Sequence, residues 1–200
     1  SRANGDRARV VGIEADAQMQ MAPGWLAAGY FSLVNGRELH NRHHLRRMPP
    51  PFGGLRIRWK PVEQNYWIEI TSSLAFAQNR LSPGDVTDAR IGGWRTRASI
   101  AEFFTGGAAN LGLVQNGRLT ATGETLEEVQ ARVLGGTEGI PLFVKTPGFL
   151  TFGARAAWQV HPQVALTVIA ENLTDRNYRW HGSGVDAPGF NLQLNTQFTF

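Results

Sequence analysis

A basic segment between residues 36 and 51 holds the side chains best suited to binding chemistry. Guanidinium groups bind carboxylates and phosphates through a planar fork of donors, and imidazole binds transition metals. The segment therefore predicts contact with an anionic ligand through Arg37, Arg42, His43, His44, Arg46 and Arg47. The competing interpretation is a solvated polar loop, because most charge clusters are solvated. The histidine spacing is not that of a helix and gives little support to a metal site.

Other polar groups offer weaker chemistry. Arg179 and His181 are two further candidate ligand contacts within residues 174–189. Asp85 and Asp88 could bind Ca²⁺ through their carboxylates, but their spacing is not that of an EF-hand. Capping of local turns is the favoured interpretation for this pair, because aspartate readily bonds nearby backbone groups.

Two glycine-rich stretches lack the partners that phosphate binding or catalysis requires. Residues 104–112 have no P-loop lysine and are interpreted as loop backbone. Ser183 lies between two glycines but lacks the strand–turn–helix context of a hydrolase nucleophile. No Ser-His-Asp set or carboxylate pair stands out. The sequence therefore predicts no catalytic residue, no enzyme activity and no cofactor.

The elements that carry these residues alternate between apolar and polar side chains. In residues 190–200 the even positions are apolar except Thr196, and the odd positions carry amides or a hydroxyl. Side chains of a strand point to opposite faces with period two, so this segment has one apolar face and one polar face. A tilted strand needs about 9–11 residues to cross a bilayer. The segment predicts the closing strand of an outer-membrane β-barrel.

Seven such stretches are predicted as strands: 11–21, 25–34, 55–60, 66–79, 149–160, 164–173 and 190–200. Their connections alternate between short and long, which is typical of bacterial outer-membrane barrels. The short turns at 22–24, 61–65 and 161–163 are expected in the periplasm. The long loops at 36–51, 80–147 and 174–189 are expected outside. Residues 125–134 predict one short helix in the longest loop, with Thr125 and Glu128 forming a capping box.

The aromatic residues beside the short turns favour a membrane barrel over a soluble β-sandwich. Trp25, Trp59, Tyr66 and Trp158 occupy the positions of a membrane aromatic girdle. Sandwich strands are also shorter, about 5–6 residues. The predicted fold is therefore all-β: an antiparallel up-and-down transmembrane β-barrel portion.

Seven strands cannot make a complete barrel, because bacterial single-chain barrels have even strand numbers. An open sheet would also leave unpaired backbone groups in hydrocarbon. Residues 1–200, which have no initiator methionine or signal peptide, are expected to be the C-terminal segment of a larger barrel domain. The chain has no cysteine, and its net charge of +4 is spread along the sequence. That distribution does not predict nucleic-acid binding.

Several stretches resemble TonB-dependent outer-membrane receptors. Residues 168–189 resemble the penultimate strand and last extracellular loop of that family, whose Asn-Leu-x-Asp-x-x-Tyr signature is matched by Asn172, Leu173, Asp175 and Tyr178. Residues 45–54 and 146–149 resemble entries into barrel strands. The terminal strand, with Phe198 and Phe200, is similar to the signal that the barrel-assembly machinery reads in many outer-membrane proteins.

The resemblance implies a barrel of about 22 strands with an N-terminal plug, of which this chain would supply the last seven. It implies a receptor in the bacterial outer membrane that imports a scarce ligand, such as a ferric siderophore, with energy transduced by TonB. The implied partners are lipid, lipopolysaccharide, the TonB complex through the N-terminal part, the assembly machinery and a small-molecule ligand. Arg56, Arg58, Glu69 and Arg155 are then expected to pair across strands or touch the plug. A passive porin or a barrel-form adhesin without a plug is the alternative, and a soluble β-binding domain is the third.

Overall fold

The structure is a computed structural model that describes residues 7–88 and 90–199. It divides into two compact units. The first consists of Ser1–Pro83 together with Lys145–Phe200, and the second, here called the inserted unit, is Gly84–Val144. Each is considered by itself.

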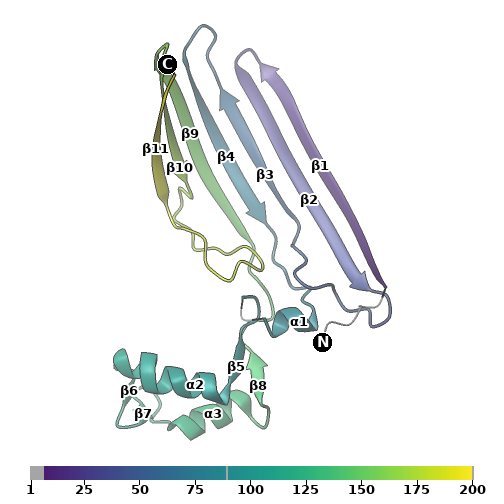
Figure 1. Ribbon diagram of the computed structural model, residues 1–200, viewed down its shortest axis with the longest axis vertical. Coiled ribbons are helices and arrows are strands. Elements are labelled where there is room, and N and C mark those ends of the chain that lie inside the picture. Colours follow the sequence, from purple (N-terminus) through teal and green to yellow (C-terminus); the bar gives the residue numbers. More distant parts are fainter. Residues whose placement is uncertain (1–6, 89, 200) are drawn as a thin grey trace. The chain divides into compact units, whose positions relative to one another are not determined.

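The first unit is a single antiparallel sheet of seven strands in the order β1-β2-β3-β4-β9-β10-β11 (Figure 1). Each strand pairs with the next long strand of the chain, which confirms the predicted up-and-down arrangement. The strands are β1 Ala8–Ala22, β2 Trp25–Glu38, β3 Phe52–Trp59, β4 Tyr66–Ala75, β9 Phe149–His161, β10 Val164–Glu171 and β11 Asn191–Phe198.

Most strand boundaries differ by a few residues from the predicted ones, and three of the differences involve specific contacts. β2 continues to Glu38 because β1 is long enough to pair with it there. β4 ends at Ala75 rather than residue 79, although Gln78 still forms an isolated antiparallel bridge with Thr146. β11 begins after Phe190, whose amide is bonded by the side chain of Asp175 at 2.8 Å.

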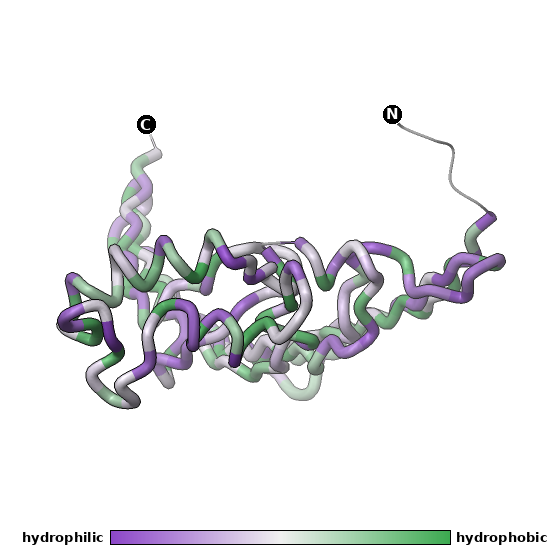
Figure 2. The backbone as a smooth tube through the Cα atoms, turned by 90° about the horizontal axis from the view of Figure 1, so that it is seen from below, coloured by the Kyte–Doolittle hydropathy of each residue, from purple (hydrophilic) through white to green (hydrophobic). Residues whose placement is uncertain are grey.

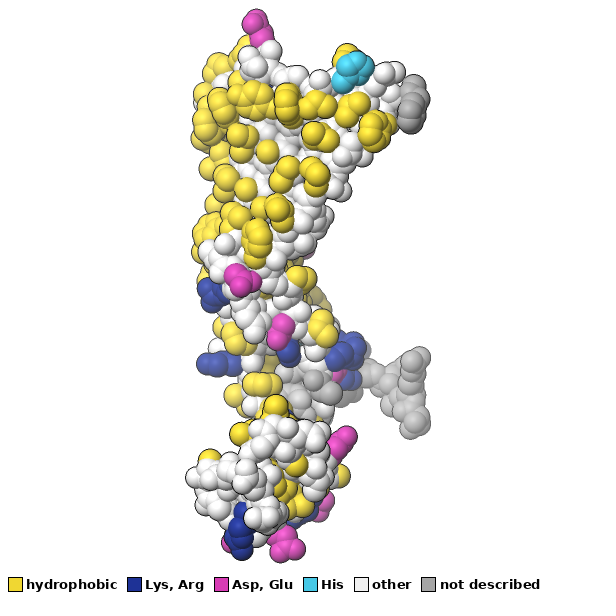
Figure 3. Space-filling view, turned by 90° about the vertical axis from the view of Figure 1, so that its left-hand side faces the viewer, with side chains coloured by type: hydrophobic (Ala, Val, Ile, Leu, Met, Phe, Trp, Pro, Cys, Tyr) yellow, Lys and Arg dark blue, Asp and Glu magenta, His cyan; other side chains and the backbone are white. Residues whose placement is uncertain are grey.

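The register places side chains of one kind on each face of the whole sheet. Trp59 lies opposite Ile68 on one face, and Arg58 lies opposite Glu69 on the other. The first face, here called the outer face, exposes large apolar side chains; Ile13 and Leu194 are 66% and 68% exposed. Figure 3 shows such hydrophobic side chains gathered over the strands.

The second face, here called the inner face, is polar and concave. Figure 2 looks along the strands and shows both edges of the sheet bent toward the same side. A depression on this face reaches from Asp16 and Gln18 in β1 to Glu171 at the end of β10. The curvature follows from the twist and coiling that strands adopt in large sheets.

Tight turns join the strand pairs at one end of the sheet. The turn between β1 and β2 needs glycine at position 24, where φ is +79°. A Cβ atom there would lie 2.3 Å from the carbonyl oxygen of Lys60, and the amide of Lys60 bonds the carbonyl of Gly24 at 2.8 Å. This contact locks the first turn against the end of β3.

The inserted unit has a small apolar core of its own. Its elements are α1 Pro83–Val86, which begins one residue earlier, β5 Trp94–Thr96, α2 Arg97–Phe103, the π-helix η1 Phe104–Ala108, β6 Val114–Gln115, β7 Arg118–Leu119, α3 Leu126–Leu134 and β8 Gly139–Pro141. The core consists of Ile100, Phe104, Val129 and Leu134. Pairing of β5 with β8 brings the entering and leaving segments of this unit side by side.

The helices of the inserted unit confirm one prediction and correct another. α3 begins after Thr125 with the expected capping box from Glu128. The prediction of a single helix is wrong, because α1 and α2 also form. The loop interpretation of residues 104–112 is wrong as well, because η1 covers residues 104–108 and the two residues after it are helical. Burial of Ile100, Phe104 and Ala108, spaced four residues apart, outweighs the low helix propensity of the two glycines in η1.

None of the helices in residues 7–88 and 90–199 combines the length and the apolar composition needed to cross a membrane.

Candidate functional site

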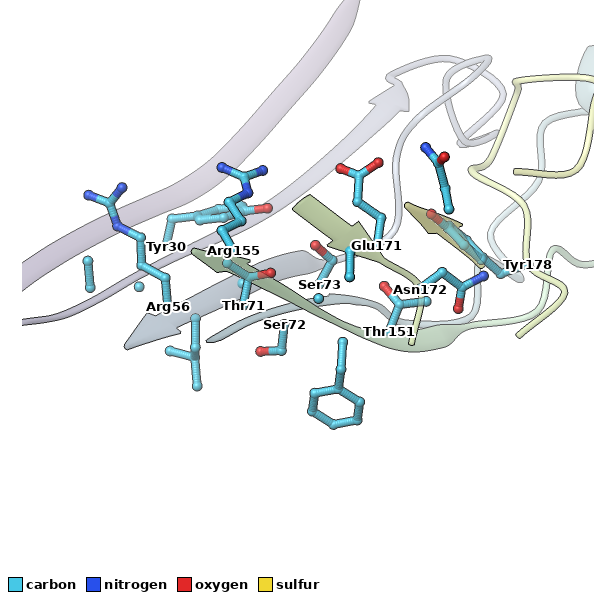
Figure 4. Close-up of a pocket in the computed structure, with 18 of the residues that line it drawn as sticks. Tyr30, Arg56, Thr71, Ser72, Ser73, Thr151, Arg155, Glu171, Asn172 and Tyr178 are labelled. Atoms are coloured by element: carbon cyan, nitrogen blue, oxygen red, sulfur yellow. The ribbon is translucent and has the colours of Figure 1, made fainter. Parts of the chain in front are cut away.

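The depression on the inner face, of about 500 Å³, is the candidate site. It is lined from all seven strands of the sheet, and Figure 4 shows the side chains of Arg56, Arg155 and Glu171 pointing to the same side. Thr71 from β4 and Thr151 from β9 contribute hydroxyl groups. Strand alternation brings these residues together, because each occupies a position whose side chain faces inward.

Two of the inner-face charges neutralise each other. Arg58 and Glu69 form an ion pair of 2.9 Å, and the Glu69 side chain is only 2% exposed. The guanidinium carbon of Arg58 lies 4.2 Å from the ring centroid of Trp67, a cation–π geometry. The predicted pairing across strands is confirmed for these two residues.

Other charges of the depression are not neutralised within the described part of the chain. Arg56 donates a hydrogen bond of 3.3 Å to the amide oxygen of Gln18 rather than to a carboxylate. Across residues 7–88 and 90–199, Asp16, Arg155 and Glu171 have no ion pair within 4.0 Å. The surface can therefore contact a polar or charged body.

The signature residue Asn172 organises the loop between β10 and β11. Asn172 is almost fully buried, and its backbone adopts a positive φ of 50°. The amide nitrogen donates to the carbonyl oxygens of Arg176 at 2.9 Å and Pro188 at 3.2 Å. The side-chain oxygen accepts from the backbone N–H of Arg176 at 3.0 Å. Asn172 thus joins the two ends of the loop.

The remaining signature residues support the same loop. Asp175 accepts from the amide of Phe190, and a Cβ atom at Gly189 would lie 2.4 Å from its carboxylate oxygen. The ring of Tyr178 lies 4.3 Å from that of Phe149. The side chain of Leu173 is exposed, while its amide bonds the carbonyl of Phe152 at 2.9 Å. In this structure the signature residues therefore stabilise the backbone conformation of the loop between β10 and β11.

A row of aromatic rings beside the depression was not expected from the sequence. Trp180 lies 4.8 Å from Phe149 and 6.1 Å from Phe52, centroid to centroid. Phe52 in turn lies 6.4 Å from Tyr30. Phe52 and Phe149 are the first residues of β3 and β9. Each alternates in phase with the inner-face residues of its strand, and this alternation was the signal in the sequence that could have placed both rings on the inner face.

The predicted basic residues of the first long loop are mostly exposed. Arg42, His43, Arg46 and Arg47 are exposed, and Arg42 and Arg47 adopt positive φ of 57°. His44 is half-buried and pairs with the backbone of Arg37. The loop therefore exposes most of its basic side chains, whereas the imidazole of His44 is half-buried.

The two candidates in the last loop have partners within the first unit. Arg179 forms an ion pair of 2.8 Å with Asp186. The Nδ1 atom of His181 lies 2.9 Å from the hydroxyl oxygen of Thr146. Both side chains therefore have a structural role within the first unit, whether or not they also contact a ligand.

One of the two carboxylates considered for Ca²⁺, that of Asp88, stabilises a turn. Asp88 accepts hydrogen bonds from the backbone N–H and the Nε of Arg90 at 2.9 and 3.2 Å. This confirms the capping interpretation for Asp88. Throughout the described residues, no group of three or more His, Asp or Glu side chains is arranged to hold a metal ion.

Aromatic residues at the short-turn end form a row along the outer face. The rings of Trp25 and Trp59 stack at 6.0 Å, and Trp59 meets Tyr66 edge-on at 6.1 Å. Tyr66 lies opposite Trp158. Near the same end, Phe198 is 59% exposed opposite Val164, while Phe200 lies outside the described residues.

Comparison with solved structures identifies the architecture. The chain superposes on the copper transporter OprC with a TM-score of 0.63 at 18% identity, over 96% of this chain and 23% of that one. The chain has the fold of a receptor barrel. The ferripyoverdine receptor of the outer membrane of Pseudomonas aeruginosa gives a TM-score of 0.55 at 13% identity, over 96% and 19% of the two chains. The ferric yersiniabactin uptake receptor FyuA from Yersinia pestis gives 0.50 at 12%, over 96% and 24%.

These neighbours are TonB-dependent outer-membrane receptors, so the resemblance read from the sequence motifs is confirmed at the level of fold. The chain spans less than a quarter of the length of each of these three structures. No protein-family model matches the chain, and no curated protein matches it.

The environment of His44 predicts a measurable titration. Burial, and then the charges of Arg37 and Arg80, hold the pKa of His44 below its usual value. Protonation is therefore disfavoured in the folded loop, and its stability falls as the pH drops below about 6.5, the usual value for the unfolded residue. We expect Arg37→Gln to raise the pKa of His44 in an NMR titration of the full-length protein in micelles. Lys60→Gln, at the opposite end of the sheet, should leave it unchanged; an unchanged pKa in both variants would contradict this account.

The role of Asn172 predicts a local loss of protection. Asn172→Ala removes three part-buried hydrogen bonds to the backbone of Arg176 and Pro188, which together contribute about 1–3 kcal/mol. We expect trypsin to cleave the full-length protein at Arg176 and Arg179 roughly 5- to 150-fold faster. Asn195→Ala, which alters an exposed amide of β11, is the matched control. Equal cleavage rates in the two variants would show that the motif does not hold the loop.

Proposed function

We propose that this chain is a segment of the transmembrane β-barrel of a bacterial outer-membrane receptor. The observation that carries the proposal is the continuous division of seven strands into an apolar outer face and a polar inner face. Monomeric soluble proteins rarely expose contiguous apolar patches larger than a few hundred Å². A bilayer accommodates such a face, provided that every backbone group within it is bonded.

The edges of the sheet support a larger barrel. In the described part of the chain, β1 pairs only with β2, and β11 pairs only with β10. An unpaired backbone group in hydrocarbon costs several kcal/mol, so both edges require further strands. A complete barrel with an even number of strands supplies them.

The full-length protein, on this proposal, imports a scarce metal-containing ligand with energy transduced by TonB. Neighbours of the same fold include a copper transporter and receptors for ferripyoverdine and ferric yersiniabactin. Ferric siderophores and similar chelates carry anionic oxygen groups. The exposed basic residues at the end of β2 and in the first loop suit such a ligand: Arg37, Arg42, His43, Arg46 and Arg47.

Other predicted residues take structural parts in this proposal. The row of Trp25, Trp59, Tyr66 and Trp158 lies at one membrane interface, where amphipathic rings prefer to sit. Phe198, together with Phe200, forms the signal read by the assembly machinery. Lipopolysaccharide phosphates offer a second class of anion to the basic loop.

The assignment of faces predicts opposite responses to the same substitution on neighbouring residues of β11. Leu194→Lys places a charge on the outer face, where it costs about 2–4 kcal/mol near the bilayer midplane. Gln193→Lys places the same charge on the inner face and should be tolerated. The measurement is the folded fraction of the full-length protein in outer membranes, read from its heat-modifiable electrophoretic mobility. Equal losses for both variants would refute the proposed membrane-facing side.

Energy coupling predicts that uptake depends on the proton-motive force. We expect bacteria carrying the full-length protein to accumulate a ⁵⁵Fe-labelled ferric siderophore from a test panel, and to lose accumulation with a protonophore or without TonB. Cells lacking the protein are the control. Uptake that persists under both treatments would instead support the passive porin.

A further inference from the structure

We propose that Gln78 is a positioning residue that couples the long connections of the sheet into one cooperative unit. The connections are the first loop, residues 39–51; the stem, residues 76–83 and 145–148; and the last loop, residues 172–190. All belong to the first compact unit. The relevance of this coupling to ligand capture rests on the proposed function, but the coupling itself does not.

Gln78 uses its buried side chain to join the first loop to the stem. It is 0% exposed. Its amide nitrogen donates to the carbonyl oxygen of Met48 in the first loop. Its amide oxygen accepts from the backbone N–H of Arg80 at 3.1 Å and from the Nε of Arg80 at 3.4 Å. The Arg80 guanidinium also reaches the carbonyl of Val34 in β2, at 3.5 Å.

The backbone of Gln78 continues the connection toward the last loop. Its N–H and C=O pair with the C=O and N–H of Thr146, both at 2.9 Å. The buried hydroxyl of Thr146 lies 2.9 Å from Nδ1 of His181. One series of hydrogen bonds therefore runs from Met48 through Gln78 and Thr146 to His181.

The burial of this series makes its opening cooperative. A buried donor or acceptor that loses its partner has no water to replace it. Breaking one hydrogen bond of the series therefore lowers the free energy needed to break the neighbouring ones. Segments that share such groups open as one unit in hydrogen exchange. If the links were only local anchors, each loop would open independently of the others.

Hydrogen exchange of the full-length protein in micelles, without ligand, separates these two behaviours. The reporter amides are Leu45, bonded to Gly36 at 3.0 Å in the first loop, and Ala187, bonded to Tyr178 at 2.8 Å in the last loop. Neither is bonded to Gln78. We expect Gln78→Met to speed exchange at both amides by about five- to tenfold.

Thr146→Val is the decisive variant because it removes only the hydroxyl next to His181. Coupling predicts faster exchange at Leu45 in the first loop as well as at Ala187. A change confined to the last loop would overturn the proposal, as would an unchanged Ala187 in Gln78→Met. This second variant preserves side-chain shape and keeps the test usable if Gln78→Met does not fold.

Gln159→Met provides the matched control at the short-turn end. Gln159 also donates from its side-chain amide to a backbone carbonyl, that of His161 at 2.8 Å. We expect neither reporter to change in this variant. Equal acceleration in all variants would indicate general destabilisation and would also overturn the coupling. Because no ligand is added, failure of the uptake experiment would leave this result untouched.

Discussion

The alternation of side chains across a continuous register is the constraint on which the rest of this structure depends. Side chains have period two, so slipping any strand by one residue would move its apolar set to the inner face. The register runs unbroken through the middle of the sheet. Its irregularities lie beside the tight turns, between Gln20 and Ala22 and between Val164 and Ala165. Because the register shifts lie next to the turns, the strands keep their apolar and polar faces in phase along the rest of their length.

The inner face distributes its charge in two ways that have different consequences. Arg58 and Glu69 neutralise each other, and Trp67 covers the guanidinium, so this pair stabilises the sheet from within. Arg155 and Glu171 have no such partner in the described residues and line the depression instead. Glu69 lies directly opposite both Arg58 on β3 and Arg155 on β9, but its carboxylate is bonded by Arg58.

At the other end of the strands, the loops are held by buried amides as well as by aromatic packing. Asn172 closes the last loop, and Gln78 joins the first loop to the stem. Such groups are directional, so they define one loop arrangement where apolar contacts would permit several. The inserted unit, in contrast, has the small apolar core of an ordinary folded domain.

The sequence alone determined the seven long strands, their order and the face that each of their residues occupies; it did not predict the four short strands of the inserted unit. The long strands follow from local alternation and turn chemistry, as in residues 190–200, and the helix at Thr125 follows likewise from its capping box. Only the tertiary structure decided where β4 ends, that α2 and η1 form, and that Asn172 and Gln78 hold loops together. The helices and loop contacts depend on partners distant in the chain: the α3 side of the core for Phe104, Pro188 for Asn172, and Met48 for Gln78. A periodic pattern records which face a side chain occupies, but it carries no information about which distant group that side chain will meet.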